Sequence, residues 1–82
     1  MNYLNKMLRF KLRELIAEKT FNEDRQITLV ELARECGVNR MTLSKIVNKK
    51  GQSINTDNLD KLCRYFNCKI EDLVEYIPDE VL

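Results

Sequence analysis

Four side chains between positions 39 and 45 could recognise the edges of nucleic-acid bases. Arg40 can donate two parallel hydrogen bonds to one guanine, and Lys45, about a turn and a half further along a helix, can reach a second base edge. Met41 offers an apolar contact for a thymine methyl group or for a neighbouring protein surface. Asn39 can cap a helix and also contact DNA close to its backbone. We therefore expect base contacts from Asn39, Arg40, Met41 and Lys45.

The segment that precedes these residues has the pattern of a short helix that ends at a glycine. Thr28 and Glu31 have the spacing of a capping box, which satisfies free backbone amides at a helix start. One apolar stripe follows at helical spacing and comprises Leu29, Leu32, Ala33 and Cys36. Gly37 comes next, where a left-handed helix end favours a residue without a β-carbon.

A second helix is expected to begin directly after this glycine. Asn39 can cap it, and Val38 and Leu43 have the spacing of a hydrophobic staple. The expected buried stripe comprises Leu43, Ile46 and Val47, and the outward face comprises Arg40, Met41, Ser44 and Lys45. Two helices joined at a sharp turn predict a helix-turn-helix over residues 28–48, whose second helix, 39–48, enters the major groove of DNA.

These residues resemble the DNA-binding domain of the Cro and phage-repressor family of bacterial regulators. The resemblance extends over roughly residues 8–76, and its most specific part is the segment L-A-x-x-x-G-V-x-x-x-T-L-S. Ala33 matches the small residue at which the family's two helices cross closely, and Gly37 matches the turn glycine. Leu29 departs from the family, which usually has at that position a glutamine that touches a phosphate.

The resemblance implies a lambda-repressor-like arrangement of five helices and a set of contacts to the sugar-phosphate backbone. The residues that match backbone-contacting positions are Thr28, Thr42, Asn48, Lys49 and Lys50. Such contacts orient a protein on DNA without specifying the sequence. Val47 stands where some family members place a charged residue tied to the first helix, so we expect that tie to be absent.

The remaining sequence predicts a scaffold of helices in a single domain, residues 1–82. A first helix is expected from about Tyr3 to Lys19, followed by a polar connection in which Phe21 folds back on the core. The expected core stripe of that helix is Leu4, Leu8, Leu12, Leu15 and Ile16. A fourth helix begins after a cap at Asn55 or Thr56, and a fifth covers residues 70–77 before Pro78. No segment predicts a strand, so the expected fold is an all-α, compact five-helix bundle.

Charge is divided unevenly along the chain, although the net charge is only +1. Residues 1–50 contain eleven Lys or Arg and six Asp or Glu, whereas residues 51–82 contain three and seven. A basic half beside an acidic half predicts one surface that faces phosphates and another that avoids them. Lys49 and Lys50 follow the second helix directly, which supports an electrostatic role for them.

An enzyme is not expected, and no catalytic residue is assigned. The chain has no histidine, which removes the commonest general base, and its two glycines cannot form a phosphate-binding loop. Three thiolates could hold a zinc ion or contribute to an iron–sulfur cluster, but the spacing of Cys36, Cys63 and Cys68 fits no known pattern. We expect buried, reduced thiols, no metal and no cofactor.

A homodimer is expected because a single recognition helix contacts few bases and helix-turn-helix proteins bind paired half-sites. Tyr3, Met7 and Phe10 form a second apolar stripe on the predicted first helix, and the tail over residues 77–82 is unusually apolar. The tail could cover this stripe within one subunit, or either surface could form the dimer contact.

The sequence as a whole predicts a sequence-specific, DNA-binding transcriptional regulator that represses a promoter. No secretory signal or long apolar run is present, so we expect a soluble, cytoplasmic protein that binds double-stranded DNA and no membrane. Two alternatives remain: an antitoxin that also binds a toxin protein, and a protein-interaction module that has lost DNA binding.

Overall fold

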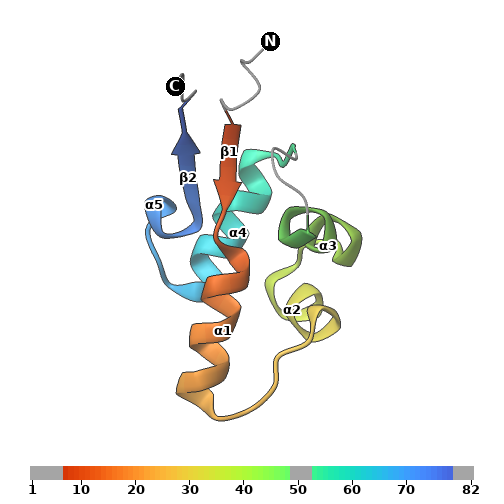
Figure 1. Ribbon diagram of the computed structural model, residues 1–82. Helices are drawn as coiled ribbons and strands as arrows, with labels where there is room; N and C mark the ends of the chain where they lie inside the picture. The colour runs from red at the N-terminus through yellow and green to blue at the C-terminus, as the bar shows by residue number, and fades with distance from the viewer. Residues whose placement is uncertain (1–6, 49–52, 79–82) are drawn as a thin grey trace.

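Helices form most of the fold, and two short strands lie beside each other at one end (Figure 1). The computed structural model describes residues 7–48 and 53–78. Within these residues the elements are β1 Met7–Phe10, α1 Leu12–Glu23, α2 Leu29–Cys36, α3 Arg40–Asn48, α4 Thr56–Phe66, α5 Ile70–Leu73 and β2 Val74–Ile77. The helix-turn-helix predicted for residues 28–48 is therefore present as α2 and α3.

At the start of α2, Thr28 caps the helix as predicted, but Glu31 does not form the second half of the predicted capping box. The Glu31 backbone amide donates to Thr28 Oγ1 at 3.1 Å, as a capping residue requires. The Glu31 carboxylate does not complete the capping box, because it accepts a hydrogen bond from Arg25 at 2.6 Å. Arg25 precedes the helix and so anchors the connection from α1 to α2.

The turn between α2 and α3 has the predicted glycine geometry. Gly37 has a φ of +80°, and its amide donates to the Ala33 carbonyl oxygen at 3.0 Å. Val38 and Leu43, which flank the start of α3, are both buried, as expected for a hydrophobic staple. The sharp turn thus brings α3 across α2, where the half-buried Ala33 packs against the core.

A small apolar core joins all the helices to the base of the sheet. Its buried residues are Phe10, Leu12, Leu32, Val38, Leu43, Ile46, Leu62 and Leu73. Each helix contributes at least one of these side chains, so the position of α3 depends on packing against the whole scaffold.

The ends of α4 are fixed by two asparagines. Asn55 caps the start by accepting a hydrogen bond from the Asn58 amide at 2.8 Å, which confirms one of the two expected caps. Asn67 ends the helix with a φ of +52°, and the Cys68 amide donates to the Cys63 carbonyl oxygen at 3.0 Å. This six-to-one bond is typical of a Schellman motif, in which the side chains at these two positions pack together.

The two strands correct the expectation of an all-α fold. The prediction of a first helix from Tyr3 to Lys19 is wrong over residues 7–10, which form β1, and α1 begins at Leu12 and continues to Glu23. The predicted fifth helix over residues 70–77 is also too long, because it ends at Leu73 and the chain continues as β2. Residues 1–6, including Tyr3 and Leu4, lie outside the described chain.

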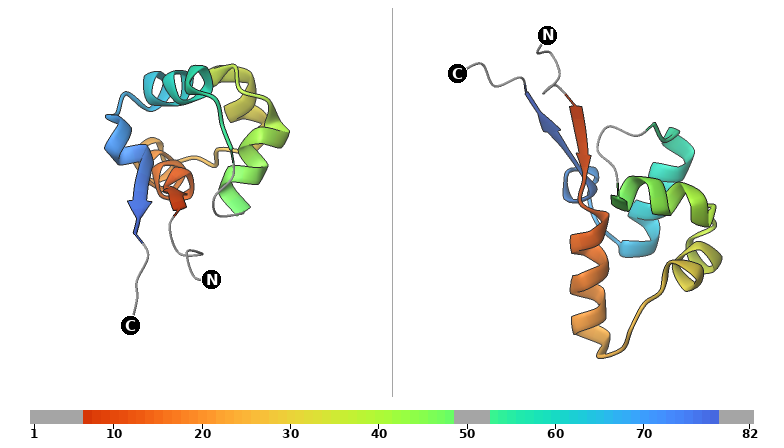
Figure 2. Two further views of the ribbon diagram at one scale, coloured as in Figure 1. Left: turned by 90° about the horizontal axis from the view of Figure 1, so that it is seen from above. Right: turned by 45° about the vertical axis from the view of Figure 1, so that its right-hand side comes forward.

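The strands pair in antiparallel register, with Leu8 opposite Tyr76 and Phe10 opposite Val74. Alternation along a strand places these four side chains on one face of the sheet. Phe10 is buried in the core, whereas Leu8 is 47% exposed and Tyr76 is 60% exposed. Figure 2 shows why, since the strands leave the helical body and extend beyond it. Leu8 is therefore not the core residue that the helical stripe predicted.

Phe21 likewise departs from its predicted place on the core. The segment expected to be a polar connection continues α1 as far as Glu23, and Phe21 lies on its outer side, 84% exposed. Leu15 and Ile16, on the inner side of α1, pack against the core as expected.

Candidate nucleic-acid interface

The outward face of α3 gathers most of the residues predicted to touch bases. Arg40, Met41 and Lys45 are exposed, and Met41 is 64% exposed. A shallow hollow on this face is bordered by Arg40, Met41, Ser44, Lys45 and Asn48. Polar donors beside an apolar methionine match the mixed surface of the DNA major groove, where hydrogen-bonding groups alternate with thymine methyls.

Asn39 performs the predicted capping role at the start of α3. Its Oδ1 accepts a hydrogen bond from the Met41 amide at 2.7 Å, and its backbone carbonyl accepts from the Leu43 amide at 3.1 Å. The carboxamide oxygen is thus used by the helix, and the side-chain amino group remains the part of Asn39 that can donate outward.

The residues matched to backbone-contacting positions lie in different settings. Thr28 is exposed at the start of α2, Thr42 is half-buried on α3, and Asn48 is exposed at the end of α3. Lys49 and Lys50 lie outside the described residues.

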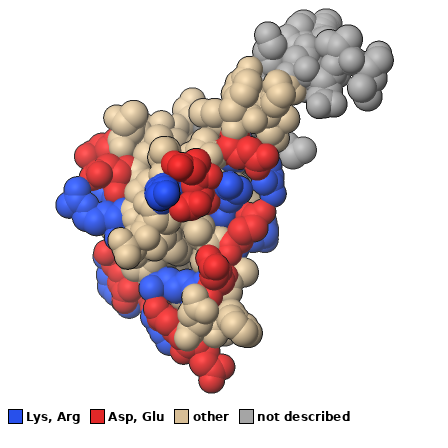
Figure 3. All heavy atoms as spheres, turned by 90° about the vertical axis from the view of Figure 1, so that its left-hand side faces the viewer, with Lys and Arg blue, Asp and Glu red and all other residues tan. Residues whose placement is uncertain are grey.

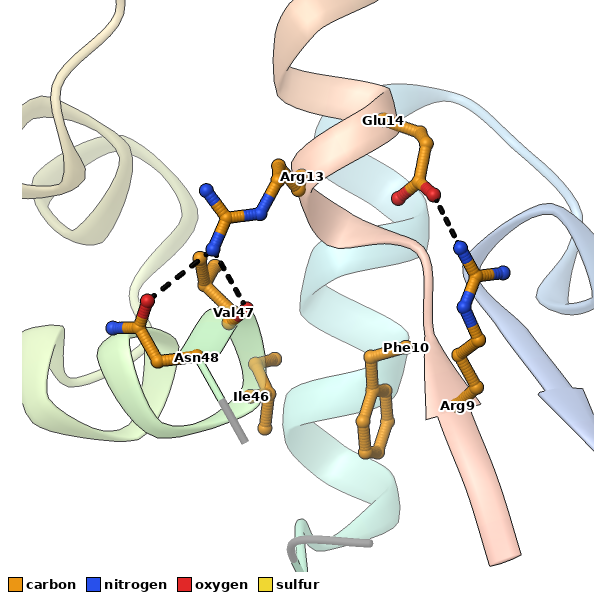
Figure 4. Close-up of a pocket in the computed structure, with 7 residues that line it drawn as sticks. All are labelled: Arg9, Phe10, Arg13, Glu14, Ile46, Val47 and Asn48. Carbon is orange, nitrogen blue, oxygen red and sulfur yellow. Dashed lines mark hydrogen bonds and ion pairs between the residues drawn. The ribbon is translucent and has the colours of Figure 1, made fainter. Parts of the chain in front are cut away.

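The C-terminal end of α3 is tied to α1 by Arg13. Its guanidinium donates to the Val47 carbonyl oxygen at 3.1 Å and to Asn48 Oδ1 at 3.2 Å (Figure 4). Val47 cannot provide the charged side-chain tie of some family members, but its backbone carbonyl oxygen links α3 to α1 instead. A cation at the C-terminal end of a helix also interacts favourably with the helix dipole.

A cavity of about 240 Å³ lies beside this tie, between β1, the start of α1 and the end of α3. Phe10, Ile46 and Val47 contribute apolar walls, while Arg9 and Glu14 form an ion pair at its edge, 2.6 Å apart (Figure 4). Arg9 also pairs with Glu75 across the sheet at 2.8 Å. The Arg9 ion pairs link β1 to α1 and to β2, while the Arg13 hydrogen bonds link α1 to the end of α3.

Charge is distributed differently on α3 and on the side of the molecule that carries α5 and β2. The sequence of α3 contains Arg40 and Lys45 but no acidic residue. Among the described residues, neither of these two cations takes part in an ion pair, so both charges remain available to a partner. On the side with α5 and β2, acidic and basic side chains lie next to one another (Figure 3). Within the described residues, α3 thus combines two positive charges that form no ion pair with the absence of an acidic residue on the same helix.

Two residues of this surface were missed as functional candidates in the sequence. Ser44 faces outward, as predicted, but it was not assigned a role, and Asn48 Nδ2 donates to its Oγ at 3.3 Å. Arg13 gave no local signal, because its contacts lie 34 and 35 residues away along the chain.

Metal-binding and membrane-spanning features have little support in the described parts of the chain. The cysteines Cys36, Cys63 and Cys68 are free and half-buried, and residues 7–48 and 53–78 contain no cluster of three or more potential metal ligands. None of the helices in these ranges is both long and apolar enough to span a membrane.

Comparison with known proteins identifies the fold and the family. The crystal structure of the transcriptional regulator VanUg superposes with a TM-score of 0.65 over 92% of this chain and 91% of that one, at 22% sequence identity. An uncharacterised helix-turn-helix-type transcriptional regulator of Bacillus subtilis (strain 168), YozG, is 30% identical over 56 residues, which are 68% of this chain and 67% of YozG. Residues 11–79 match the Cro/C1-type HTH DNA-binding domain. The chain therefore belongs to the family of Cro/C1-type helix-turn-helix DNA-binding domains.

Proposed function

We propose that this DNA-binding transcriptional regulator is a repressor that places α3 in the major groove at a promoter. The observation that carries the proposal is the composition of the α3 surface, where Arg40, Met41 and Lys45 are exposed beside one hollow without an acidic neighbour on the helix. Repression needs only occupancy of the promoter, whereas activation also needs a contact to the transcription machinery.

Sequence preference arises from four side chains in this proposal. Arg40 donates in bidentate fashion to guanine N7 and O6, and Met41 packs against a thymine methyl group. Lys45 donates to a second base edge, and Asn39 donates through its free amino group near the start of the helix. Each is exposed and therefore reaches DNA without rearrangement of the core.

Affinity that does not depend on the DNA sequence comes from contacts to the sugar-phosphate backbone of DNA. Thr28, Thr42, Asn48, Lys49 and Lys50 neutralise or hydrogen-bond phosphates on either side of the groove. The N-terminal end of α2 supports this assignment, because its unpaired amides and helix dipole favour a phosphate close to Thr28. Release of counterions from DNA then makes binding strongly dependent on salt.

The protein acts as a homodimer in the cytoplasm in this proposal. Phe10, one of the residues expected at the dimer contact, is buried in the core of its own subunit. We therefore place the contact at the exposed residues Leu8 and Tyr76 instead. These two apolar side chains are opposite each other on the part of the sheet that extends beyond the helices (Figure 2). Within the described residues each strand also has one edge without a pairing partner, which a second copy can satisfy.

Binding to duplexes from the protein's own upstream region tests this function. The proposal predicts a preferred site with two half-sites about 34–36 Å apart and an affinity that falls steeply with salt. Equal affinity for upstream and unrelated duplexes at every salt concentration contradicts it.

A further inference from the structure

A chain of hydrogen bonds runs from α1 through the end of α3 to the base-facing surface. Arg13 donates to Asn48 Oδ1 at 3.2 Å, and Asn48 Nδ2 donates to Ser44 Oγ at 3.3 Å. Figure 4 shows the first of these contacts, with Arg13 reaching across from α1 to the carboxamide of Asn48. The last residue of the chain, Ser44, borders the same hollow as Arg40, Met41 and Lys45.

The chemistry of the three groups fixes the direction of every bond in this chain. A guanidinium has only donors, so the Asn48 carboxamide must present its oxygen to Arg13. Arg13 is itself held by the Val47 carbonyl oxygen at 3.1 Å, which keeps it in place. Rotation of the carboxamide by half a turn would set its amino group against the guanidinium, so Asn48 Nδ2 faces Ser44.

This arrangement determines what the Ser44 hydroxyl can offer to a partner. A serine oxygen carries one proton and two lone pairs, and here one lone pair accepts from Asn48. The hydroxyl itself donates no hydrogen bond to another of the described residues. The proton is therefore available to a group that lies over the hollow.

We propose that Ser44 contributes to specificity as a hydrogen-bond donor, and that Arg13 and Asn48 are positioning residues that favour this polarity by occupying one of its two lone pairs. The inference rests on the proposed function and adds which bases are preferred at one base pair of the site. A serine ordinarily accepts or donates and so tolerates any base. Held by Asn48, Ser44 selects a base with a major-groove acceptor, namely guanine N7 or O6, adenine N7 or thymine O4. It disfavours cytosine, which presents an amino group there, because acceptance through the second lone pair leaves the hydroxyl proton without a partner.

A competing use of the hydroxyl is a bond to the backbone of its own helix. Serine in a helix can donate to the carbonyl oxygen four residues earlier, which for Ser44 is that of Arg40. In that case the Ser44 side chain makes no hydrogen bond to a base, and its removal leaves the base preference unchanged. Substitutions at Ser44 and Asn48 separate the two possibilities.

The experiment selects bound duplexes from a random library and sequences them, for the full chain and three variants. Ser44→Ala is expected to lose preference at one base pair by about 3- to 10-fold, the effect of one hydrogen bond, and to keep the preferences at other positions. Ser53→Ala, which alters an exposed serine outside α3, serves as the matched control and keeps the whole parental profile.

Asn48→Asp gives the sharper result, because it reverses the polarity of the chain. A carboxylate only accepts, so Asp at this position accepts a hydrogen bond from the Ser44 hydroxyl while it still pairs with Arg13. Ser44 then presents a lone pair, and the preferred base at the same position changes to one with an amino group, cytosine or adenine. The added negative charge weakens binding to every sequence but does not by itself reverse a preference.

The inference is overturned if Ser44→Ala keeps the parental profile, or if Asn48→Asp prefers guanine or thymine, which lack a major-groove amino group, at the position that Ser44→Ala relaxes. A parent chain that enriches no sequence at all contradicts the proposed function instead. Circular dichroism spectra that match the parent show that each variant is folded.

Discussion

Lys61 on α4 holds the turn of the helix-turn-helix, since its Nζ donates to the Gly37 carbonyl oxygen at 3.3 Å. A β-carbon added at Gly37 would meet the Lys61 side chain at 3.9 Å, an ordinary van der Waals distance. Space therefore permits a side chain at position 37. The constraint at Gly37 is its φ of +80°, which L residues rarely adopt.

Substitution of Gly37 is expected to destabilise the protein in an order set by backbone preference. Gly37→Ala costs about 1–2 kcal/mol, Gly37→Asn costs less, and the β-branched Gly37→Val costs most. Each kcal/mol lowers the melting temperature by about 4–8 °C in a domain of this size. Lys61→Met, which removes this exposed hydrogen bond and the exposed ion pair of Lys61 with Asp57 at 3.6 Å, is the control and melts close to the parent. Equal melting temperatures for the parent and the Ala and Val variants contradict this account of the turn.

Enlargement of Ala33 tests the close approach of α2 and α3. Ala33 is half-buried against the core, so Ala33→Leu overpacks this contact and costs about 1–3 kcal/mol. Because α3 is displaced, DNA affinity is expected to fall together with thermal stability. Ala17→Leu makes the same change at an exposed position of α1 and leaves both unchanged. Indistinguishable melts for the Ala33 and Ala17 variants rule out a tight crossing at Ala33.

The thiol of Cys68 provides a prediction about pH. Burial, together with the neighbouring Cys63 thiol, raises the pKa of Cys68 from 9.0 to about 11. The folded state holds this proton to higher pH than the unfolded state. The corresponding stability is therefore present below pH 9 and is lost as the pH rises from 9 towards 11.

Alkylation with iodoacetamide, followed by mass spectrometry, measures this pKa directly. The rate at Cys68 in the folded protein is expected to keep rising up to pH 11, whereas the urea-unfolded chain has its midpoint near the ordinary value of 9.0. A folded-state midpoint at the ordinary value overturns this prediction. Cys68→Ala is expected to lose less stability than the parent between pH 9 and 11.

The proposed dimer contact predicts that charge at the extended end of the sheet produces monomers. Leu8→Lys combined with Tyr76→Lys is expected to halve the mass that light scattering gives for the parent, from a dimer to the 9.7 kDa chain. Phe21→Lys removes another exposed apolar side chain, on α1, and leaves the mass unchanged. The dimer is excluded if the parent itself has a monomer mass both free and on DNA.

Local sequence signals predicted the helix-turn-helix correctly, because its boundaries are set by neighbouring residues. Thr28, Gly37 and Asn39 each perform their structural role through contacts within four residues. The sheet depends instead on pairing between Phe10 and Val74, which no local pattern reveals. Leu8 and Leu12 fit a helical stripe as well as they fit the real arrangement, and the alternation of Val74, Glu75 and Tyr76 is too short to predict a strand.

The candidate interface was predictable only as far as it depends on α3 alone. The exposure of Arg40, Met41 and Lys45 follows from helical periodicity, since Leu43 and Ile46 define the buried side. The tie from Arg13 to Val47 requires the three-dimensional crossing of α1 and α3. The hydrogen bond between Asn48 and Ser44 is local, but its direction is set by Arg13.

The most direct test of the central claim compares Arg40→Ala with the parent on the preferred duplex and on a random duplex. If α3 reads the major groove, the variant loses about 1–3 kcal/mol on the preferred site and relaxes the preference at one base pair. Arg64→Ala removes a matched charge on α4, where Arg64 pairs with Asp60 at 2.7 Å, and keeps the parental selectivity. Unchanged affinity of Arg40→Ala for both duplexes would contradict the assignment of α3 as the recognition helix.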